Sequence, residues 1–311
     1  MGAPLGHPYA HRNGLETRGT WSLQESALHI NCLELLAATY AIKAFTKTLS
    51  NVHVLIQIDN TSAIAYINKM GGAKQGVLDQ HARTLWEWSL ARKITLRAEH
   101  LPGRLNVIAD AESRAKPNAA DWKLDLEVFQ VLNQRYGPFT ISLFANRNNS
   151  QLERFYSYLP DPLAEQFDAL VQPWREENAY AFPPFNLISK CLRKASLEVA
   201  TLLIICPVWP AQPWYPHLLR LLTDNPLLLP THDDLLLDPL GNSHPMVINN
   251  SLPLAGWKVS GNTSLQRVYQ KKLQRFSSLP NADQQMLSTS PVGQSGVAGV
   301  IKDRLIPFNQ L

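Results

Sequence analysis

The stretch that most constrains the fold is the apolar run at residues 52–58, which leads directly into the acidic residue Asp59. A run of this length and composition predicts a buried strand, and the segment 62–69 that follows predicts a helix. In α/β proteins, ligands and reacting groups collect at the carboxyl ends of strands. Asp-Asn-Thr is also a common turn and helix-capping sequence, so a purely structural role for Asp59 stays open at this point.

Composition indicates a globular protein. The chain has 311 residues, of which 45% are hydrophobic and 17% charged, and this length accommodates two domains. Its three cysteines form no C-x-x-C pair, which argues against a disulfide framework and against a zinc site. The apolar run 201–209 is too short to span a bilayer, and the N-terminus lacks a signal-peptide pattern. We therefore expect an intracellular protein, in the cytoplasm or the nucleus, without a membrane partner.

The net charge of +4 is unevenly placed along the chain. Residues 1–120 carry a basic excess of four, residues 121–235 an acidic excess of four, and residues 236–311 again a basic excess of four. A basic first third is compatible with a polyanionic partner such as nucleic acid.

The order of predicted elements indicates two α/β units followed by a tail. In residues 1–116, helices at 31–45, 62–69, 77–92 and 106–114 alternate with strands at 52–58 and 93–99, which predicts an α/β layered domain. A second α/β unit is expected over residues 122–235. Residues 236–311 are rich in polar residues and are expected to be a largely irregular linker or tail with one basic amphipathic helix.

Three carboxylates in the first domain are candidates for a common site: Glu34, Asp59 and Asp110. Each has a structural alternative, because Asn31 and Glu34 resemble a capping box and Asp110 lies at the positive end of a short helix. Considered together, the three carboxylates favour a catalytic, metal-binding role. Hydrolysis of a phosphodiester needs a nucleophilic water and charge relief at the leaving oxygen, and two divalent ions about 4 Å apart supply both.

The segments LELLAA, IQIDNTSAIAYINK and EHLPGRLNVIADAESR resemble motifs of ribonuclease H. The resemblance implies a ribonuclease H-like fold over residues 1–116 and metal-dependent cleavage of RNA–DNA hybrids. It assigns Glu34, Asp59 and Asp110 as ligands of Mg²⁺ or Mn²⁺, and His100 as a loop histidine that assists product release or proton transfer. Further candidates for contacts with nucleic acid are Asn60, Lys69, Lys74 and Asn106. The family's first catalytic aspartate has no counterpart here, because Asp59 is the first aspartate of the sequence.

The amino-acid sequences of these segments are similar to those of DIRS-type retrotransposon polyproteins, which integrate with a tyrosine recombinase. This similarity implies a reverse transcriptase domain upstream, a recombinase downstream, and an RNA–DNA hybrid or DNA as partner. The main functional prediction is a hybrid-cleaving ribonuclease H-like protein. The alternatives are a non-catalytic nucleic-acid-binding remnant and a DNA adenine methylase-like binding module.

The segments SLFANRNNSQLERFYS, AYAFPPFNLI and PVWPAQPWYP resemble DNA adenine methylases. That family carries an acid-Pro-Pro-aromatic motif, whose first side chain accepts a hydrogen bond from the adenine amino group while the aromatic ring stacks on the flipped base. Here Pro183, Pro184 and Phe185 are retained, but Phe182 replaces the acceptor. The segment SLFANRN contains no glycine. We therefore expect a degenerate methylase-like module that has lost its catalytic activity.

Overall fold

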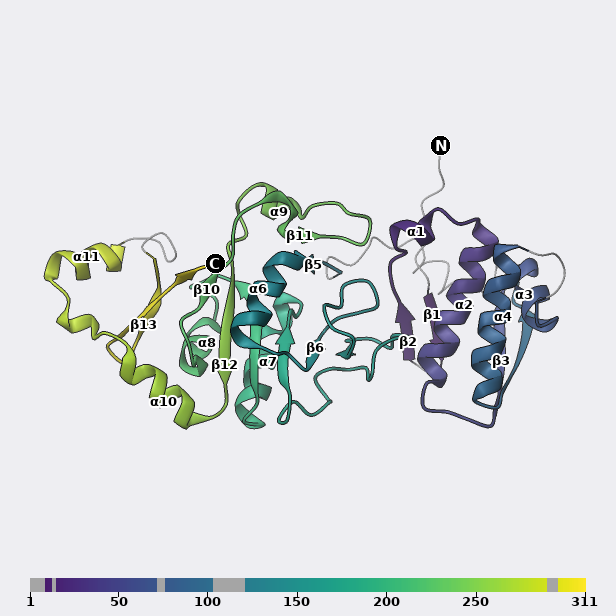
Figure 1. Ribbon diagram of the computed structural model, residues 1–311, viewed down its shortest axis with the longest axis horizontal. Coiled ribbons are helices and arrows are strands. Elements are labelled where there is room, and N and C mark those ends of the chain that lie inside the picture. Colours follow the sequence, from purple (N-terminus) through teal and green to yellow (C-terminus); the bar gives the residue numbers. More distant parts are fainter. Residues whose placement is uncertain (1–8, 13–14, 72–75, 103–120, 290–295) are drawn as a thin grey trace. The chain divides into compact units, whose positions relative to one another are not determined.

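The computed structural model describes residues 9–12, 15–71, 76–102, 121–289 and 296–311 (Figure 1). The chain divides into two compact units. The first comprises Met1–Ala119 and Leu159–Phe167, and the second comprises Ala120–Tyr158 and Asp168–Leu311. Within the described ranges, every helix is too short or too polar to cross a lipid bilayer.

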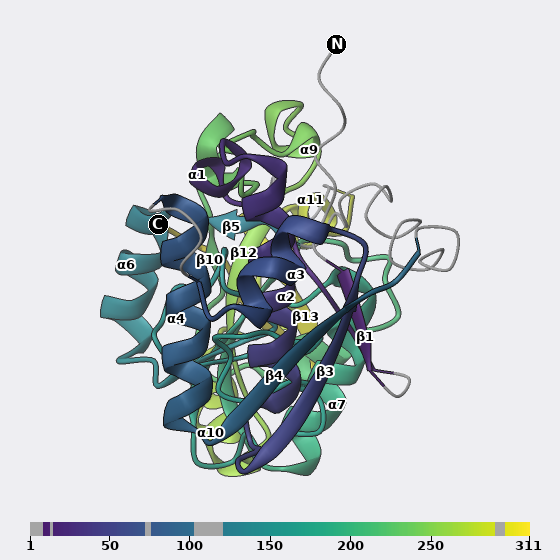
Figure 2. The ribbon, with the colours of Figure 1, turned by 90° about the vertical axis from the view of Figure 1, so that its right-hand side faces the viewer.

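The first unit is an α/β structure built around a pair of parallel strands. Its elements are β1 (Tyr9–Arg12), β2 (Leu15–Arg18), α1 (Leu23–Ser26), α2 (Ile30–Thr46), β3 (Val52–Ile58), α3 (Thr61–Asn68), α4 (Val77–Ala91) and β4 (Ile94–His100). Strands β3 and β4 are parallel and in register from Val52 opposite Ile94 to Ile58 opposite His100 (Figure 2). Strands β1 and β2 form a separate antiparallel pair.

The core of the first unit lies between the three longer helices and one face of the β3–β4 pair. On β4, buried residues alternate with exposed ones, and the buried positions are Ile94, Leu96 and Ala98. They pack with residues of the helices such as Leu35 and Ile67. This period of two is the pattern of a strand with one buried face. The predicted helix at 106–114 lies outside the described residues.

The second unit is built on a mixed seven-stranded sheet in the order β15-β10-β12-β9-β8-β6-β7. Its strands are β6 (Ile141–Leu143), β7 (Phe155–Tyr156), β8 (Asn178–Ala181), β9 (Thr201–Pro207), β10 (Leu227–Leu228), β12 (Leu254–Ser260) and β15 (Asn309–Gln310). Strands β7, β6, β8 and β9 are mutually parallel, and β12 is antiparallel to its neighbours β9 and β10.

Helices cover both faces of this sheet. Helices α7 (Ile188–Leu197) and α8 (Tyr215–Leu221) share one buried cluster with residues of β9 such as Leu202 and Ile204. On the other face, α6 (Leu126–Tyr136) shares a second cluster with Leu203 and Ile205. Because both faces of β9 are covered, the strand is an almost continuous apolar run rather than an alternating one.

The expectation of an irregular tail over residues 236–311 is wrong. This segment contains β11 (Leu236–Leu237), α9 (Pro245–Ile248), β12, α10 (Thr263–Lys272), α11 (Asn281–Thr289), β13 (Val297–Ile301), β14 (Arg304–Pro307) and β15. The fully buried Trp257 lies on β12, in the middle of the sheet. The small residues Ala255 and Gly256 make this strand difficult to recognise from the sequence. A Cβ atom on Gly256 would lie 3.3 Å from a side-chain carbon of Leu132 of α6, which is a tight contact, and glycine has low strand propensity.

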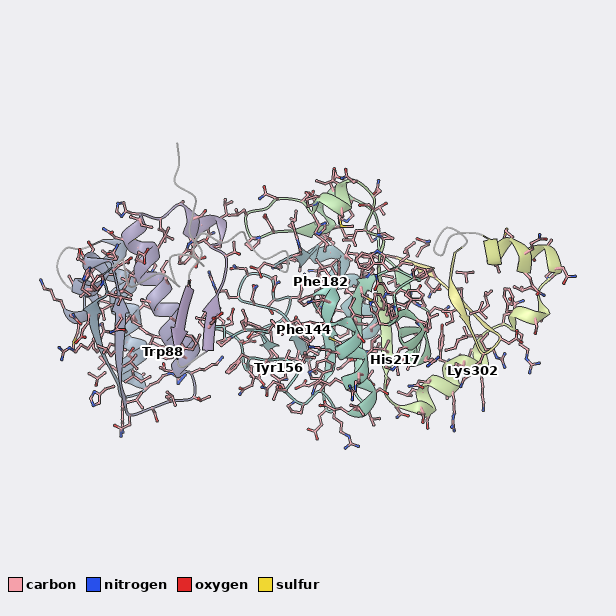
Figure 3. All side chains as sticks on the ribbon, turned by 180° about the vertical axis from the view of Figure 1, so that it is seen from behind. Trp88, Phe144, Tyr156, Phe182, His217 and Lys302 are labelled. Carbon is pink, nitrogen blue, oxygen red and sulfur yellow. The ribbon has the colours of Figure 1, made fainter. Side chains whose placement is uncertain are left out.

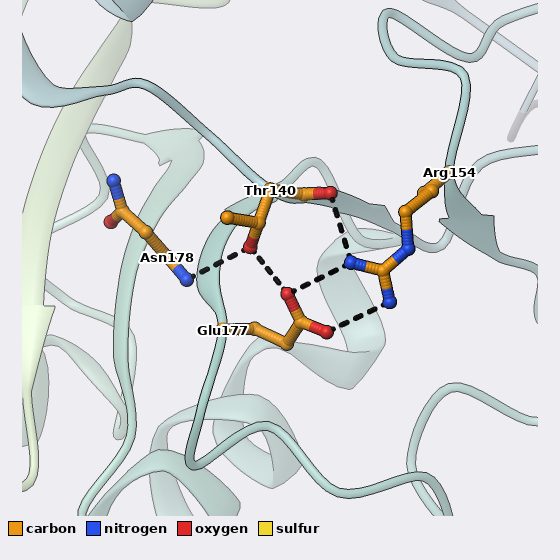
Figure 4. A network of polar contacts seen from close by, with 4 residues as sticks. All are labelled: Thr140, Arg154, Glu177 and Asn178. Atoms are coloured by element: carbon orange, nitrogen blue, oxygen red, sulfur yellow. Dashed lines mark hydrogen bonds and ion pairs between the residues drawn. The ribbon is translucent and has the colours of Figure 1, made fainter.

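A polar network joins the amino ends of three parallel strands (Figure 4). Thr140 precedes β6, Arg154 precedes β7, and Glu177 precedes β8. The Arg154 guanidinium donates to both carboxylate oxygens of Glu177, at 3.0 and 3.4 Å, and the Thr140 hydroxyl donates to the same carboxylate. The backbone N–H of Asn178 donates to the Thr140 hydroxyl at 3.0 Å. These contacts close the amino ends of the three strands with internal hydrogen bonds, whereas ligands of α/β sheets bind at the carboxyl ends.

Candidate functional site

The second unit has a topological switch point at β6. The chain passes from β6 to β7 on one side, and then returns so that β8 pairs with β6 on the other side. In open α/β sheets, such a reversal leaves a crevice outside the carboxyl ends of the two strands, and ligands bind there. The candidate site therefore consists of the turn after β6 and the segment after β8.

The turn after β6 begins with a strained residue. Phe144 has a φ of 64°, in the left-handed region that costs a residue with a side chain about 1–2 kcal/mol. Its ring is buried and meets Trp174 edge to face, with ring centroids 6.0 Å apart, and this burial offsets the strain. Nucleotide-binding turns use glycine after the first strand so that the ligand can approach the backbone closely. Here that position carries a bulky buried ring.

The next residues of the turn satisfy their own backbone donors. The N–H of Asn146 donates to Asn149 Oδ1 at 2.7 Å, while the N–H groups of Asn148 and Asn149 donate to Asn146 Oδ1 at 2.8 and 3.2 Å. The Asn146 amide also donates to Asp121 at 2.7 Å. Side-chain to backbone bonds of this kind close a turn without a ligand. The three backbone N–H groups that a bound anion or cofactor would need are therefore already engaged.

Aromatic residues dominate the segment after β8. Phe182 follows the strand directly and is half-buried, and Pro183 and Pro184 lead into a short 3₁₀ helix, η2 (Phe185–Leu187). The Phe185 ring lies 6.4 Å from that of Phe182 and meets Trp209 edge to face at 5.3 Å. Trp209 follows β9, so the carboxyl ends of two adjacent parallel strands supply this group. Its half-buried rings offer an apolar, π-rich surface rather than a polar one.

Three buried polar atoms lack a hydrogen-bond partner among the described residues: Trp122 Nε1, Gln151 Oε1 and the Tyr180 hydroxyl. Tyr180 lies on β8, and its full burial raises the pKa of its hydroxyl. The side chains of Trp122 and Gln151 flank β5 (Lys123–Leu124), and the Trp122 ring packs against His244 with centroids 4.5 Å apart. Because all three atoms are shielded from solvent, none of them offers an open polar contact to a ligand.

In the first unit, the structure brings Glu34 and Asp59 together. The Asn60 amide donates to Asn31 Oδ1 at 3.0 Å, so the first turn of α2 lies beside the end of β3. The pKa of Glu34 is raised, first by burial and then by the neighbouring Asp59 carboxylate. His100 is opposite Ile58 in the β3–β4 register, so it lies at the same edge as Asp59.

The caps of this region differ from the predicted ones. His29, not Asn31, caps α2, and its Nδ1 accepts from the Asn31 N–H at 3.2 Å. The capping box of this region is instead formed by Ser22 and Glu25. Glu34 therefore lies beyond the capping positions, and the capping-box interpretation of Asn31 and Glu34 is wrong. Asn60 caps α3 by accepting from the Ala63 N–H at 2.9 Å, which leaves the Asp59 carboxylate outside the cap.

The remaining predicted site residues are only partly placed. Lys74, Asn106 and Asp110 lie outside the described residues, so the predicted set of three carboxylates stays a prediction. Lys69 is exposed at the end of α3. In the described ranges, no group of three or more His, Cys, Asp and Glu side chains is arranged to hold a metal ion.

A cavity of about 270 Å³ lies elsewhere in the first unit, between the end of α2 and residues 159–167. Lys47, Asp161 and Glu165 are among its lining residues, and the pKa of Lys47 is lowered mainly by burial while the two carboxylates oppose that shift. None of the predicted site residues lines this cavity. The candidate sites are therefore the carboxyl ends of β6 and β8 in the second unit and the carboxyl end of β3 in the first unit.

A family model described as DNA N-6-adenine-methyltransferase (Dam) matches residues 112–222. The match covers the switch point, the turn after β6, the Pro-Pro segment and Trp209, and it ends before β10 and β12. No curated protein matches the chain. The chain thus contains a methylase-like region with a mixed α/β fold. The ribonuclease H-like interpretation of residues 1–116 remains a prediction.

Sequence reasoning identified the Pro-Pro segment but missed two parts of its surroundings. The segment PVWPAQPWYP did not reveal the contact of Trp209 with Phe185, because that contact depends on β8 and β9 being neighbours. The segment SLFANRNNSQLERFYS likewise did not reveal that the side chains of Asn146 and Asn149 accept hydrogen bonds from the backbone N–H groups of the turn. The spacing of these two asparagines, directly after the apolar stretch at 141–145, was the available signal.

Proposed function

We propose that the second unit is a DNA-binding module related to DNA adenine methylases that does not transfer a methyl group. The observation that carries the proposal is Phe182, which stands at the carboxyl end of β8 where the methylase motif has its hydrogen-bond acceptor. A phenyl ring cannot accept a hydrogen bond from the adenine amino group as a carboxylate or an amide does. Adenine would therefore be held here without its amino group being oriented for reaction.

The residues present do not fit S-adenosylmethionine, the methyl donor used by this family. The turn after β6 carries the buried ring of Phe144, and the N–H groups of Asn146, Asn148 and Asn149 already donate to side chains of the turn. The unpartnered polar atoms nearby are shielded from solvent.

Binding of DNA is supported by the aromatic surface that the module retains. Half-buried rings such as Phe185 and Trp209 can stack on a base taken out of the duplex, and stacking of one base on an aromatic ring is worth about 1–3 kcal/mol. An unpaired base is the cheapest to extrude. The expected ligand is therefore DNA with an unstacked or mismatched adenine.

The experiment compares a duplex with one unpaired adenine and the same duplex fully paired, by fluorescence anisotropy on the full chain. We expect tighter binding to the unpaired duplex and a loss of that preference in Phe185→Leu. The matched control is Tyr158→Leu, which removes an exposed aromatic ring outside the site. Equal affinity of the wild-type chain for both duplexes would overturn the proposal.

A second measurement addresses methyl transfer. Calorimetric titration with S-adenosylmethionine is expected to show no saturable binding, and labelled methyl groups should not reach DNA. Phe182→Asn restores an acceptor but leaves the turn after β6 closed, so we expect this variant to remain inactive as well. Methylation of adenine by the unmodified chain would contradict the proposal directly.

The pairing of Glu34 with Asp59 favours a second candidate function for the first unit, namely metal-dependent cleavage of RNA–DNA hybrids. Two carboxylates that repel each other at a strand end are stabilised by a divalent cation. This candidate retains Mg²⁺ or Mn²⁺ as cofactor, Asp110 as a further ligand, and a reverse transcriptase and a recombinase as polyprotein partners. It predicts Mn²⁺ binding that Asp59→Asn weakens and that Glu87→Gln, at an exposed carboxylate of α4, leaves unchanged. Equal Mn²⁺ affinity of all three proteins would refute it.

A further inference from the structure

The last part of the chain forms a hairpin with a charged tip. Strands β13 and β14 pair antiparallel, and the two residues between them, Lys302 and Asp303, have φ values of 46° and 63°. Two consecutive residues with positive φ make the tight turn that suits the twist of a hairpin. Lys302 therefore projects from a short turn with a defined backbone (Figure 3).

This hairpin is fastened to the segment that follows α10. Arg275 and Arg304 form an antiparallel bridge, and the N–H of Leu305 donates to the Gln274 carbonyl at 2.9 Å. The Arg304 guanidinium donates to the Leu273 carbonyl at 2.8 Å. Residues about thirty positions apart are thereby held side by side.

The acidic residue of the turn is engaged within the protein. The Asp303 carboxylate accepts from the backbone N–H of Ser277 at 2.8 Å and from its hydroxyl at 2.6 Å. These hydrogen bonds, followed by the nearby Arg275 and Arg304, lower the pKa of Asp303. Asp303 is thus a fastening group that holds the turn against Ser277.

The surface built in this way is strongly basic. Residues 261–311 contain six basic and only two acidic side chains. Five of the basic residues belong to the joined segments and define what we call the basic hairpin surface: Lys271, Lys272, Arg275, Lys302 and Arg304. The side chains of the first four are exposed. On the inner side of α10, Tyr269 is buried and donates to Asn225 at 2.8 Å, which fixes the face that the helix presents.

We propose that the basic hairpin surface binds the phosphate backbone of duplex DNA independently of base sequence. Charge complementarity carries this assignment, because several cations on a rigid frame suit a regularly charged polyanion. Contacts of this kind position a protein on the duplex without reading it. The inference rests on the proposed function in that it adds a second contact, distinct from the aromatic surface at the carboxyl ends of β8 and β9.

The test is a salt titration of the full chain binding to a short, fully paired duplex. Each phosphate contact contributes about 0.9 to the slope of log affinity against log salt, so Lys271→Gln/Lys302→Gln should reduce the slope by about 2. The control, Arg175→Gln/Arg193→Gln, removes two exposed charges elsewhere in the second unit and should leave the slope unchanged. Circular dichroism of all variants establishes that they are folded.

The outcomes separate this inference from the proposed function. An unchanged slope in the lysine variant overturns the basic hairpin surface, whatever the preference for unpaired adenine. A reduced slope without any such preference supports the surface and refutes the proposed function. A lysine variant that loses binding to vesicles of anionic phospholipid but keeps its affinity for DNA would show that the surface is a membrane contact, and would overturn the inference.

Discussion

Phe185 and Trp209 lie edge to face, with ring centroids 5.3 Å apart, although each follows a different strand of the sheet. Phe185 follows β8 after the two prolines, and Trp209 follows β9. Because β8 and β9 are adjacent and parallel, their carboxyl ends place the two rings at one edge. The contact therefore combines a local motif with a feature of the topology.

This aromatic pair should be energetically coupled. Edge-to-face pairs are worth about 0.5–1.5 kcal/mol beyond the area they bury. In a double-mutant cycle with Phe185→Leu and Trp209→Leu, we expect a coupling free energy of unfolding in this range, measured by urea denaturation. Strictly additive effects would show that the rings do not interact in solution.

The turn after β6 should depend on the side chain of Asn146. Asn146→Ala removes the acceptor of two backbone N–H groups and the donor to Asp121, so we expect a loss of about 1–3 kcal/mol in unfolding free energy. Asn186→Ala, at an exposed residue of η2, provides the control and should change stability by less than about 0.5 kcal/mol. Similar losses in both variants would argue against a closed, side-chain-satisfied turn.

The segment beyond residue 236 should be essential to the second unit. Trp257→Ala removes a fully buried side chain of β12, and truncations of this kind cost about 3–5 kcal/mol. Val268→Ala, at an exposed position of α10, is the control and should be nearly neutral. Denaturant unfolding followed by circular dichroism measures both. A loss below about 1 kcal/mol for Trp257→Ala would contradict the central position of β12.

The sequence was informative where the signal was local. The predicted strand at 52–58 coincides with β3, and the apolar run at 201–209 contains β9, because both are apolar segments of strand length. Strand β12 escaped prediction because Ala255 and Gly256 weaken its pattern, and because β9 and β10 pair with it from distant parts of the chain. Two-residue strands such as β7 exist only through pairing and carry no periodicity of their own.

The candidate sites also combine signals that are local in the sequence with contacts that depend on the fold. The Pro-Pro motif and the Asp59 strand end could be read from short segments, whereas the partner of each depended on the fold. Trp209 reaches Phe185 only because β8 and β9 are neighbours, and Glu34 reaches Asp59 only because α2 begins beside the end of β3. The cap of α2 was misplaced because the cap residue, His29, lies two residues before Asn31, and the capping box of Ser22 and Glu25 belongs to the preceding helix α1.

Lys258 should make the stability of the second unit depend on pH in the alkaline range. Burial lowers the pKa of its ammonium group to about 8, while the group donates to Asn178 Oδ1 at 2.6 Å. A base whose pKa is lower in the folded state binds its proton more weakly there, so stability increases as pH rises from about 8 towards the unfolded value of about 10.4. The wild-type chain should gain up to about 3 kcal/mol over this window relative to Lys258→Met. Parallel pH profiles of the two proteins would refute the assignment.

Glu34 should give the opposite dependence in the acidic range, measured with a chelator present. Burial and the Asp59 carboxylate raise its pKa, so ionisation is disfavoured in the folded state. Stability is then greatest below the unfolded pKa of about 4.3 and falls as pH rises through the folded value. Glu34→Gln removes this penalty, so at neutral pH it should be more stable than the wild-type chain, and the difference should vanish near pH 4. Adding Mg²⁺ should raise the thermal midpoint of the wild-type chain but not that of Glu34→Gln, because only the pair of carboxylates gains from a cation between them. If the two proteins keep the same stability difference from pH 4 to 8, Glu34 and Asp59 do not repel each other and the cation-site proposal loses its physical basis.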